Sequence, residues 1–212
     1  MLKYKSDRQY TGMCFLEADM SNIGLYAMEE YVAKAKELAS AYHKGQTRIG
    51  RKGKVPYYDE HVLGVYNILK DECGIDSPDI LTMALLHDVV EDTPCTLDEI
   101  REKFGDEIAE QVGFLTRVEG EPFSIYARRL FANASYKAIL VKMADRLHNL
   151  RTIVYMHDKR WIGKKVRQTY TDILNPLPET MKRIDPVCND KIKDLADKIE
   201  QQLQTVEIFL GK

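Results

Sequence analysis

Apolar residues recur along this chain at intervals of three and four positions, the spacing that places side chains on one face of an α-helix. The pattern is clear near the C-terminus, where Ile192, Leu195 and Ile199 begin a continuous stripe. No segment series shows the strict alternation of apolar and polar residues that is typical of strands. The sequence therefore predicts an all-α fold, with helices at 26–42, around residue 61, and at 78–92, 96–115, 123–133, 135–157 and 192–206.

The chain of 212 residues suits one domain with a small extension. Residues 1–25 show no clear period and are expected to form an N-terminal lead-in. Residues 26–178 hold most of the helical pattern and are expected to form the domain. A group of three prolines around Pro178 predicts turns. Residues 179–212 should then form a C-terminal helical extension that packs on the domain.

Charge and hydropathy argue against several classes of function. Hydrophobic residues make up 44% and charged residues 30% of the chain, as in ordinary globular proteins. The formal net charge of −2 argues against binding nucleic acid through overall charge. No apolar run is long enough to cross a bilayer, and residues 1–20 lack the apolar core of a signal peptide. We therefore expect a cytoplasmic protein that binds neither nucleic acid nor a membrane.

The most informative stretch is residues 83–92, MALLHDVVED. Drawn on a helix, its apolar residues fill one arc and four polar residues share the opposite face. The four are His87, Asp88, Glu91 and Asp92. No Lys or Arg lies among them, whereas a solvated helix face usually mixes charges because like charges one turn apart repel. A divalent cation would relieve this repulsion, so the pattern favours a metal site over a solvated surface.

A second charged segment, residues 47–56 (TRIGRKGKVP), is basic and contains two glycines. We expect a loop here. Its cations are Arg48, Arg51, Lys52 and Lys54. Charge alone favours a solvated loop, but the segment leads directly into the helix that carries His61, and this position favours a role in binding a ligand.

Asp145 lies on the helix predicted at 135–157. Lys142, Asn149 and Thr152 fall within roughly 60° of it on the same face, and apolar residues fill the face opposite. Asp145 and Asn149 are one turn apart and can therefore contact the same ligand. The spacing alone leaves open the alternative that Asp145 forms a surface ion pair with a neighbouring arginine.

Four segments resemble, in order, the hydrolase-domain motifs of the RelA/SpoT family of alarmone enzymes, which are HD-domain phosphohydrolases. They are AYHKGQTR, VPYYDEHVLGVYNIL, ALLHDVVEDT and VKMADRLHNLRT, and QTYTDILNPL is similar to a further, weaker segment. The resemblance covers about residues 27–178. No recognisable synthetase, TGS or ACT region follows, so the chain resembles the stand-alone small alarmone hydrolases, which include the metazoan SpoT homologues.

The resemblance implies a single helical HD domain that removes the 3′-pyrophosphate from guanosine tetra- or pentaphosphate, leaving GDP or GTP and pyrophosphate. The guanosine alarmone would be its partner, and Mn²⁺, one per chain, its cofactor. The residues that match the metal ligands of the family are His61, His87, Asp88 and Asp145. Two imidazoles and two carboxylates suit a first-row divalent ion of intermediate hardness.

Glu91 and Asp92 match an acidic pair close to the attacking water, and we favour Asp92 as the general base and Glu91 as the residue that positions the water. The candidate substrate-binding residues are Arg48, Arg51, Lys52, Lys142, Arg146, Asn149 and Thr152. Relative to the family pattern, three residues are inserted in the basic segment. Either Arg48 or Arg51 could therefore stack on the guanine.

Two other interpretations follow from the same residues. An HD phosphohydrolase could act on another nucleotide, such as an adenosine alarmone, a deoxynucleotide or NADPH, and the altered basic segment leaves this open. A non-catalytic HD module could only bind a nucleotide, although the intact acidic pair and four ligand matches argue against it. We expect His43 and His148 to be structural.

Overall fold

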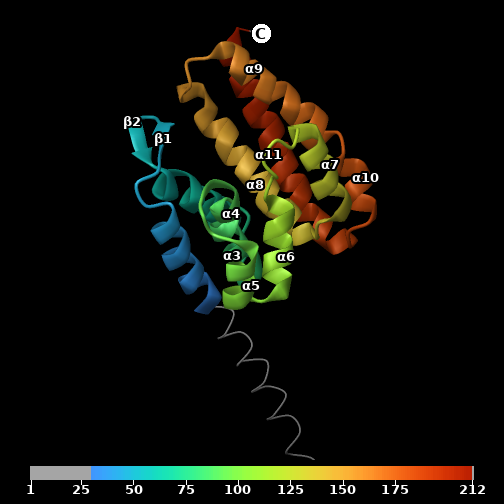
Figure 1. Ribbon diagram of the computed structural model, residues 1–212. Coiled ribbons are helices and arrows are strands. Elements are labelled where there is room, and N and C mark those ends of the chain that lie inside the picture. Colours follow the sequence, from blue (N-terminus) through green and yellow to red (C-terminus); the bar gives the residue numbers. More distant parts are fainter. Residues whose placement is uncertain (1–29, 212) are drawn as a thin grey trace, which may run out of the picture.

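The chain folds into a compact arrangement of helices with one small hairpin at its edge, as the computed structural model in Figure 1 shows for residues 30–211. The expected lead-in and the first residues of the helix expected at 26–42 lie outside the described residues. The described elements are a helix at 30–42, β1 (Thr47–Gly50), β2 (Gly53–Pro56), the π-helical turns η1 (Tyr58–Val62), η2 (Ile68–Glu72) and η4 (Thr169–Leu174), the 3₁₀ turn η3 (Ile153–Tyr155), and the helices α2 (Leu63–Asn67), α3 (Pro78–Leu86), α4 (Val89–Asp92), α5 (Leu97–Phe104), α6 (Asp106–Leu115), α7 (Phe123–Asn133), α8 (Tyr136–Thr152), α9 (Lys159–Gln168), α10 (Leu177–Lys182) and α11 (Pro186–Leu210). The predicted all-α class is confirmed.

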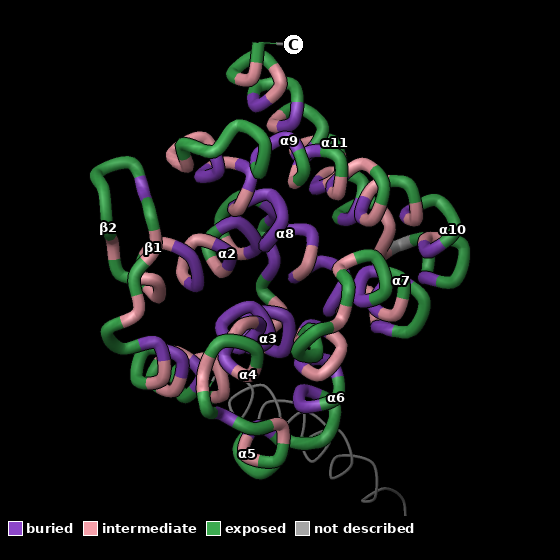
Figure 2. The backbone as a smooth tube through the Cα atoms, turned by 45° about the horizontal axis from the view of Figure 1, so that its top comes forward, coloured by how far each residue is buried: buried purple, intermediate pink, exposed green. Residues whose placement is uncertain are grey.

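Helix α8 runs through the middle of the molecule and is buried over most of its length (Figure 2). It packs against α11, and also against α2, α3 and α6. Its buried residues include the polar side chains of Asp145, Arg146 and His148. Polar groups inside a protein need hydrogen-bonding partners. We therefore expect other elements to place polar side chains against these residues of α8.

The loop prediction for residues 47–56 was wrong, because these residues form an antiparallel hairpin of β1 and β2. Gly50 pairs with Gly53, so Arg51 and Lys52 make a two-residue turn at its tip. Gly53, the residue directly after the turn, has a φ of 95°, a backbone conformation that glycine adopts without steric cost. Each strand is only four residues long, too short for alternation to be visible in the sequence.

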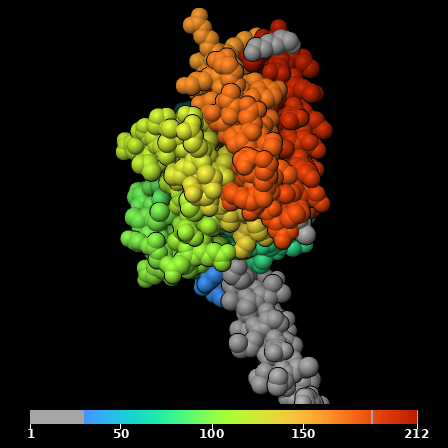
Figure 3. All heavy atoms as spheres, turned by 90° about the vertical axis from the view of Figure 1, so that its right-hand side faces the viewer, coloured from blue at the N-terminus to red at the C-terminus, as the bar shows by residue number. Residues whose placement is uncertain are grey.

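The prediction of turns near Pro178 is correct in part, because residues 175–176 and 183 are turns and a short helix lies between them. Pro178 lies in the first turn of α10, where its missing N–H is not needed for a helical hydrogen bond. The domain boundary expected after Pro178 therefore falls inside this helix. Figure 3 shows α10 and α11, coloured orange to red, side by side along one face of the molecule. None of the helices in residues 30–211 is both long and apolar enough to cross a bilayer.

The packing of α11 on α8 predicts that the C-terminal helix contributes to the stability of the whole domain. Leu203 is fully buried in α11 and the neighbouring Gln204 is exposed. Leu203→Ala should lower the free energy of unfolding by about 2–5 kcal/mol because it leaves a cavity in the core. Gln204→Ala should change it by less than about 0.5 kcal/mol. Urea unfolding followed by circular dichroism measures both, and equal values would show that α11 is not part of the cooperative unit.

Candidate active site

A cavity of about 510 Å³ opens between the hairpin, α4, the C-terminal half of α8 and α9. The site residues expected from the sequence that line it are Arg48, His61, Asp88, Glu91, Asp92, Lys142, Asp145, Arg146, Asn149 and Thr152. His87 is not part of the lining but contacts two residues that are. Arg51 and Lys52 are not part of it either, because the hairpin turn carries them to its exposed tip.

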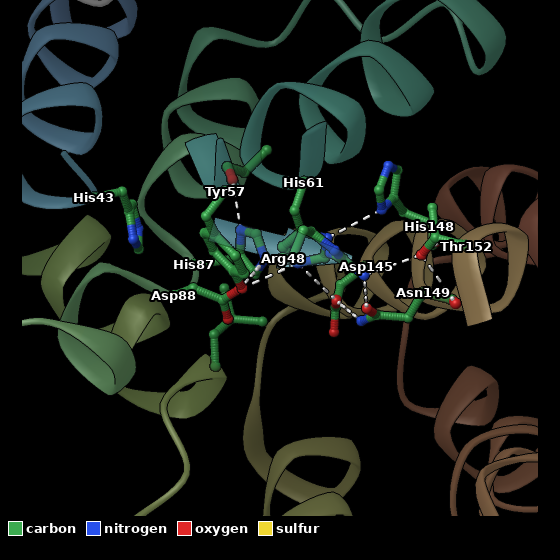
Figure 4. A network of polar contacts seen from close by, with 12 residues as sticks. His43, Arg48, Tyr57, His61, His87, Asp88, Asp145, His148, Asn149 and Thr152 are labelled. Atoms are coloured by element: carbon green, nitrogen blue, oxygen red, sulfur yellow. Dashed lines mark hydrogen bonds and ion pairs between the residues drawn. The ribbon is translucent and has the colours of Figure 1, made fainter. Parts of the chain in front are cut away.

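His61 and Asp88 of the cavity lining meet His87 directly behind it (Figure 4). The Nε2 atoms of His61 and His87 are 3.2 Å apart, and Oδ2 of Asp88 lies 3.1 Å from the first and 3.0 Å from the second. Neighbouring ligands of an octahedral ion such as Mg²⁺ are roughly 3 Å apart. The three atoms therefore form a triangle of the size that one divalent cation needs.

His87 and Asp88 lie at a break between α3 and α4, so the continuous helix predicted at 78–92 was wrong at this point. In an unbroken helix the carbonyl oxygen of Ala84 would accept from the N–H of Asp88. Here the ring of His87 donates to that oxygen instead, from Nδ1 at 2.8 Å. Side chains that take over a backbone carbonyl in this way compete with the helix. The same bond leaves Nε2 of a neutral His87 free to bind a metal.

Asp145 adjoins this triangle through His61. Its Oδ1 lies 3.4 Å from Nε2 of His61 and accepts a hydrogen bond of 2.5 Å from Nδ2 of Asn149, while Oδ2 pairs with Nζ of Lys142 at 2.8 Å. Burial would raise the pKa of Asp145, but Lys142 and the two histidines hold that pKa well below its usual range. Asp145 is therefore ionised and borders the triangle through His61, although the group of described residues whose ligand atoms lie close enough to share one ion contains His61, His87 and Asp88 without it.

The ligand atoms of these histidines and carboxylates, and the charges around them, suit a divalent cation. Burial would lower the pKa of His87, but the carboxylates of Asp88 and Asp145 raise it to about 9. Asp88 is ionised, because its two histidine neighbours outweigh burial and keep its pKa well below the usual range. The cluster thus attracts positive charge, and a metal and a proton compete for it. Imidazole and carboxylate ligands together suit first-row ions such as Mn²⁺, Fe²⁺ or Zn²⁺.

Glu91 and Asp92 lie at the rim of the cavity, one turn after Asp88. Both carboxyl oxygens of Glu91 are engaged by Arg117, whose backbone N–H donates at 2.9 Å and whose Nε lies 3.5 Å away. Asp92 forms no ion pair with any residue in 30–211. Burial and the nearby charge of Asp88 raise the pKa of both groups. Carboxyls of this kind are better proton acceptors than ordinary surface acids.

Arg48 of β1 reaches across the cavity to the end of α8. Its Nη2 donates to Oγ1 of Thr152 at 3.0 Å and to Oδ1 of Asn149 at 3.2 Å (Figure 4). Its guanidinium lies 5.8 Å from the ring of Tyr57. Three of the expected nucleotide-binding residues are therefore assembled on one wall, and of the two arginines that the sequence left open, Arg48 is the one on the cavity.

Another part of the cavity lining is cationic and aromatic. Arg146 is buried, forms no ion pair with a described residue, and stacks on Phe123 with its guanidinium 5.0 Å from the ring. Lys165 of α9 lies 5.3 Å from the ring of Trp161. Burial lowers the pKa of Lys165, and the positive charges of Arg146 and Arg117 lower it further. Uncompensated cations of this kind favour an anion in the cavity.

Two residues that contact the His61–His87–Asp88 triangle were not expected from the sequence. The hydroxyl of Tyr57 donates to Oδ2 of Asp88 at 2.5 Å, and Nδ1 of His148 lies 3.0 Å from Nδ1 of His61. Both are close to residues that were assigned: Tyr57 precedes His61 by one helical turn and His148 precedes Asn149. Neither gave a signal of its own, because each acts through a contact between distant segments.

The chain is similar to known proteins in sequence and in fold. The sequence profile of the HD domain matches residues 35–179. The chain belongs to the HD-domain family. This HD domain is 37% identical over 142 residues to the guanosine-3′,5′-bis(diphosphate) 3′-pyrophosphohydrolase MESH1 of Xenopus tropicalis, an alignment that covers 66% of this chain and 78% of that protein. It is 32% identical over 203 residues to a protein of the same enzymatic name from Spiroplasma citri, covering 89% of this chain but 26% of that longer protein.

Among solved structures, the HD domain is similar to a metazoan ortholog of SpoT that hydrolyses ppGpp and plays a role in starvation responses. The TM-score is 0.59 at 26% sequence identity, over 78% of this chain and 93% of that chain. The resemblance to RelA/SpoT hydrolases inferred from the sequence motifs is confirmed. The two kinds of relative differ in length, because the chain spans most of the metazoan proteins and about a quarter of the Spiroplasma protein.

Proposed function

We propose that this HD domain is a metal-dependent guanosine-3′,5′-bis(diphosphate) 3′-pyrophosphohydrolase acting in the cytoplasm. The observation that carries the proposal is the position of the His61–His87–Asp88 triangle, which opens into the same cavity as the Arg48–Asn149–Thr152 wall. A site for a cation and a site for a nucleoside are thus within reach of one ligand. The Xenopus and Spiroplasma relatives are named for this reaction, and the cavity contains the residues that the proposal requires.

The charges of the cavity suit a substrate with several phosphate groups. Five basic side chains line it: Arg48, Arg117, Lys142, Arg146 and Lys165. Four acidic side chains line it: Asp88, Glu91, Asp92 and Asp145. The lining therefore carries one more formal positive charge than negative, and a bound divalent ion would add to this excess. A guanosine alarmone carries phosphate groups at both the 3′ and 5′ positions, so one can lie at the metal while the other faces the Arg146 and Lys165 wall.

The reaction breaks the bond between the ribose 3′ oxygen and phosphorus. A water oxygen bonds to that phosphorus, Asp92 accepts the proton of the water, and the 3′ oxygen gains a proton as pyrophosphate leaves. Glu91, fixed by Arg117, positions the water, and Lys142 offsets charge on the phosphate groups. A bound divalent ion supplies Lewis acidity, which polarises a phosphoryl oxygen and makes water more acidic. We propose Mn²⁺ as that ion, one per chain.

Product analysis tests the function directly. The metal-stripped protein is incubated with guanosine tetra- or pentaphosphate in the presence of Mn²⁺, Mg²⁺ or Zn²⁺, and the products are identified by mass spectrometry. We expect GDP or GTP and one equivalent of pyrophosphate, with the highest rate in Mn²⁺. In ¹⁸O-labelled water the label should enter pyrophosphate and not the nucleotide. Turnover of NADPH or a deoxynucleotide, with the guanosine alarmones left intact, would contradict the proposal.

Two isosteric or truncating substitutions separate the base from the metal ligands. Asp92→Asn should lower kcat by about a hundredfold or more while leaving Mn²⁺ affinity unchanged, because it removes the proton acceptor and keeps the shape. Asp145→Ala should lose both Mn²⁺ binding and activity. Isothermal titration calorimetry and steady-state rates on the same preparations measure both properties. Near-normal turnover by Asp92→Asn would remove this residue from the base role.

The hairpin provides a matched pair of arginines. Arg48→Ala should raise KM for guanosine tetraphosphate by about 10- to 100-fold, since a hydrogen bond to a charged group contributes about 1.5–3 kcal/mol. Arg51→Ala, at the exposed hairpin tip, should leave KM close to wild type. Steady-state kinetics at saturating Mn²⁺ distinguishes the two. A larger effect of Arg51→Ala would show that the tip, and not the root of the hairpin, contacts the substrate.

A further inference from the structure

The two histidines of the His61–His87–Asp88 triangle have different hydrogen-bonding partners. His87 donates from Nδ1 to the carbonyl oxygen of Ala84, which can only accept, so the position of its hydrogen is fixed. His61 has an imidazole as its partner instead: its Nδ1 lies 3.0 Å from Nδ1 of His148, and both rings are buried. Figure 4 shows this contact on the side of His61 away from His87. A carbonyl oxygen can only accept a hydrogen bond, whereas an imidazole nitrogen can either donate or accept one. The direction of the hydrogen bond between His61 and His148 is therefore not fixed by the atom types alone.

We propose that His148 is a positioning residue that accepts a hydrogen bond from Nδ1 of His61 and thereby presents Nε2 of His61 to the metal. The inference rests on the proposed metal-dependent function. Histidines that bind metals generally donate their other ring N–H to a nearby acceptor, which fixes both the tautomer and the ring orientation. His148 fills that role here with an uncharged nitrogen.

Counting hydrogens shows why the acceptor matters. One hydrogen must lie between the two Nδ1 atoms, because two nitrogen lone pairs facing each other at 3.0 Å repel. If His148 donates it, a neutral His61 carries its own hydrogen on Nε2 and directs it toward Asp88 and Asp145. If His148 accepts it, Nε2 of His61 is free. Only the second arrangement allows His61 to bind a cation, so metal binding selects the state in which His148 accepts.

The position of His148 depends on Gly64 of α2. A Cβ atom at Gly64 would lie 2.3 Å from Nε2 and 2.4 Å from Cδ2 of His148, closer than atoms can approach. The missing side chain thus makes a slot for the ring, which then meets the ring of His61 edge-on, with centroids 5.0 Å apart and an interplanar angle of 63°. Because α2 follows directly after the turn that carries His61, the slot and the metal ligand belong to one continuous segment.

The first test compares His148→Asn with His148→Leu. Both side chains branch at Cγ and are similar in size, but only asparagine places an acceptor, Oδ1, near the position of Nδ1 in histidine. Mn²⁺ affinity of the metal-stripped full chain is measured by isothermal titration calorimetry. We expect His148→Leu to bind Mn²⁺ about 10- to 100-fold more weakly than wild type. His148→Asn should recover most of that loss, which a purely space-filling role would not produce.

The second test moves His148 without changing its chemistry. Gly64→Ala should also weaken Mn²⁺ binding, because its methyl group displaces the ring. In a His148→Ala background the ring is absent, and the same substitution at Gly64 should then have no further effect. The losses of Mn²⁺ affinity caused by Gly64→Ala and by His148→Ala are therefore expected to be strongly non-additive in the double variant. Circular dichroism on each variant identifies any loss that results from unfolding, and the Asn–Leu comparison decides the question if Gly64→Ala does not fold.

The outcomes separate this inference from the proposed function. Equal Mn²⁺ affinity of wild type and His148→Leu overturns the positioning role and leaves the metal site intact. An asparagine variant as weak as the leucine variant overturns the acceptor argument, and fully additive losses overturn the role of the slot. A wild-type protein that binds neither Mn²⁺ nor another divalent ion overturns the metal site, and the positioning role with it.

Discussion

Holding two carboxylates, the buried Asp145 and the partly buried Asp88, against the same ring of His61 is the constraint on which the rest of the site depends. A carboxylate inside a protein is costly unless positive or hydrogen-bonding groups face it. Lys142 compensates Asp145 directly, whereas Asp88 faces two imidazoles and the hydroxyl of Tyr57. The excess negative charge that remains explains the attraction of this cluster for a proton or a metal. The chemistry of the site is therefore a consequence of how its charges are balanced.

Helix α8 connects this charge balance to the fold. It is the central, mostly buried helix, and over about three turns it carries Lys142, Asp145, Arg146, His148, Asn149 and Thr152. Side chains on a rigid, well-packed element keep their relative positions better than side chains on loops. The apolar residues of the same helix pack against α11 and α3, so the forces that stabilise the core also hold the cavity wall in place.

Local patterns in the sequence were enough to predict most of the longer helices and the acidic cluster, because residue type and spacing along one helix determine both. They did not predict α9 or α10. They were not enough for features that depend on contacts between distant segments. The break at His87 follows from a ring that takes the carbonyl of Ala84, and spacing alone cannot show which way a side chain turns. The partner of His61 is 87 positions away, and Arg48 meets Thr152 across 104 positions. Such pairs become visible only when the chain is folded.

The hairpin has one more consequence, for how this segment can vary. Its base is closed by a hydrogen bond from Tyr57 to the carbonyl oxygen of Gln46, and Arg48 lies next to that base rather than at the tip. The strands can therefore be lengthened or shortened at the far end while the guanidinium of Arg48 keeps its contacts with Asn149 and Thr152. Residues added at the hairpin tip would lie outside the cavity, while the base of the hairpin stays in contact with it. A peptide tag or fluorophore inserted between Arg51 and Lys52 would occupy the same permissive position.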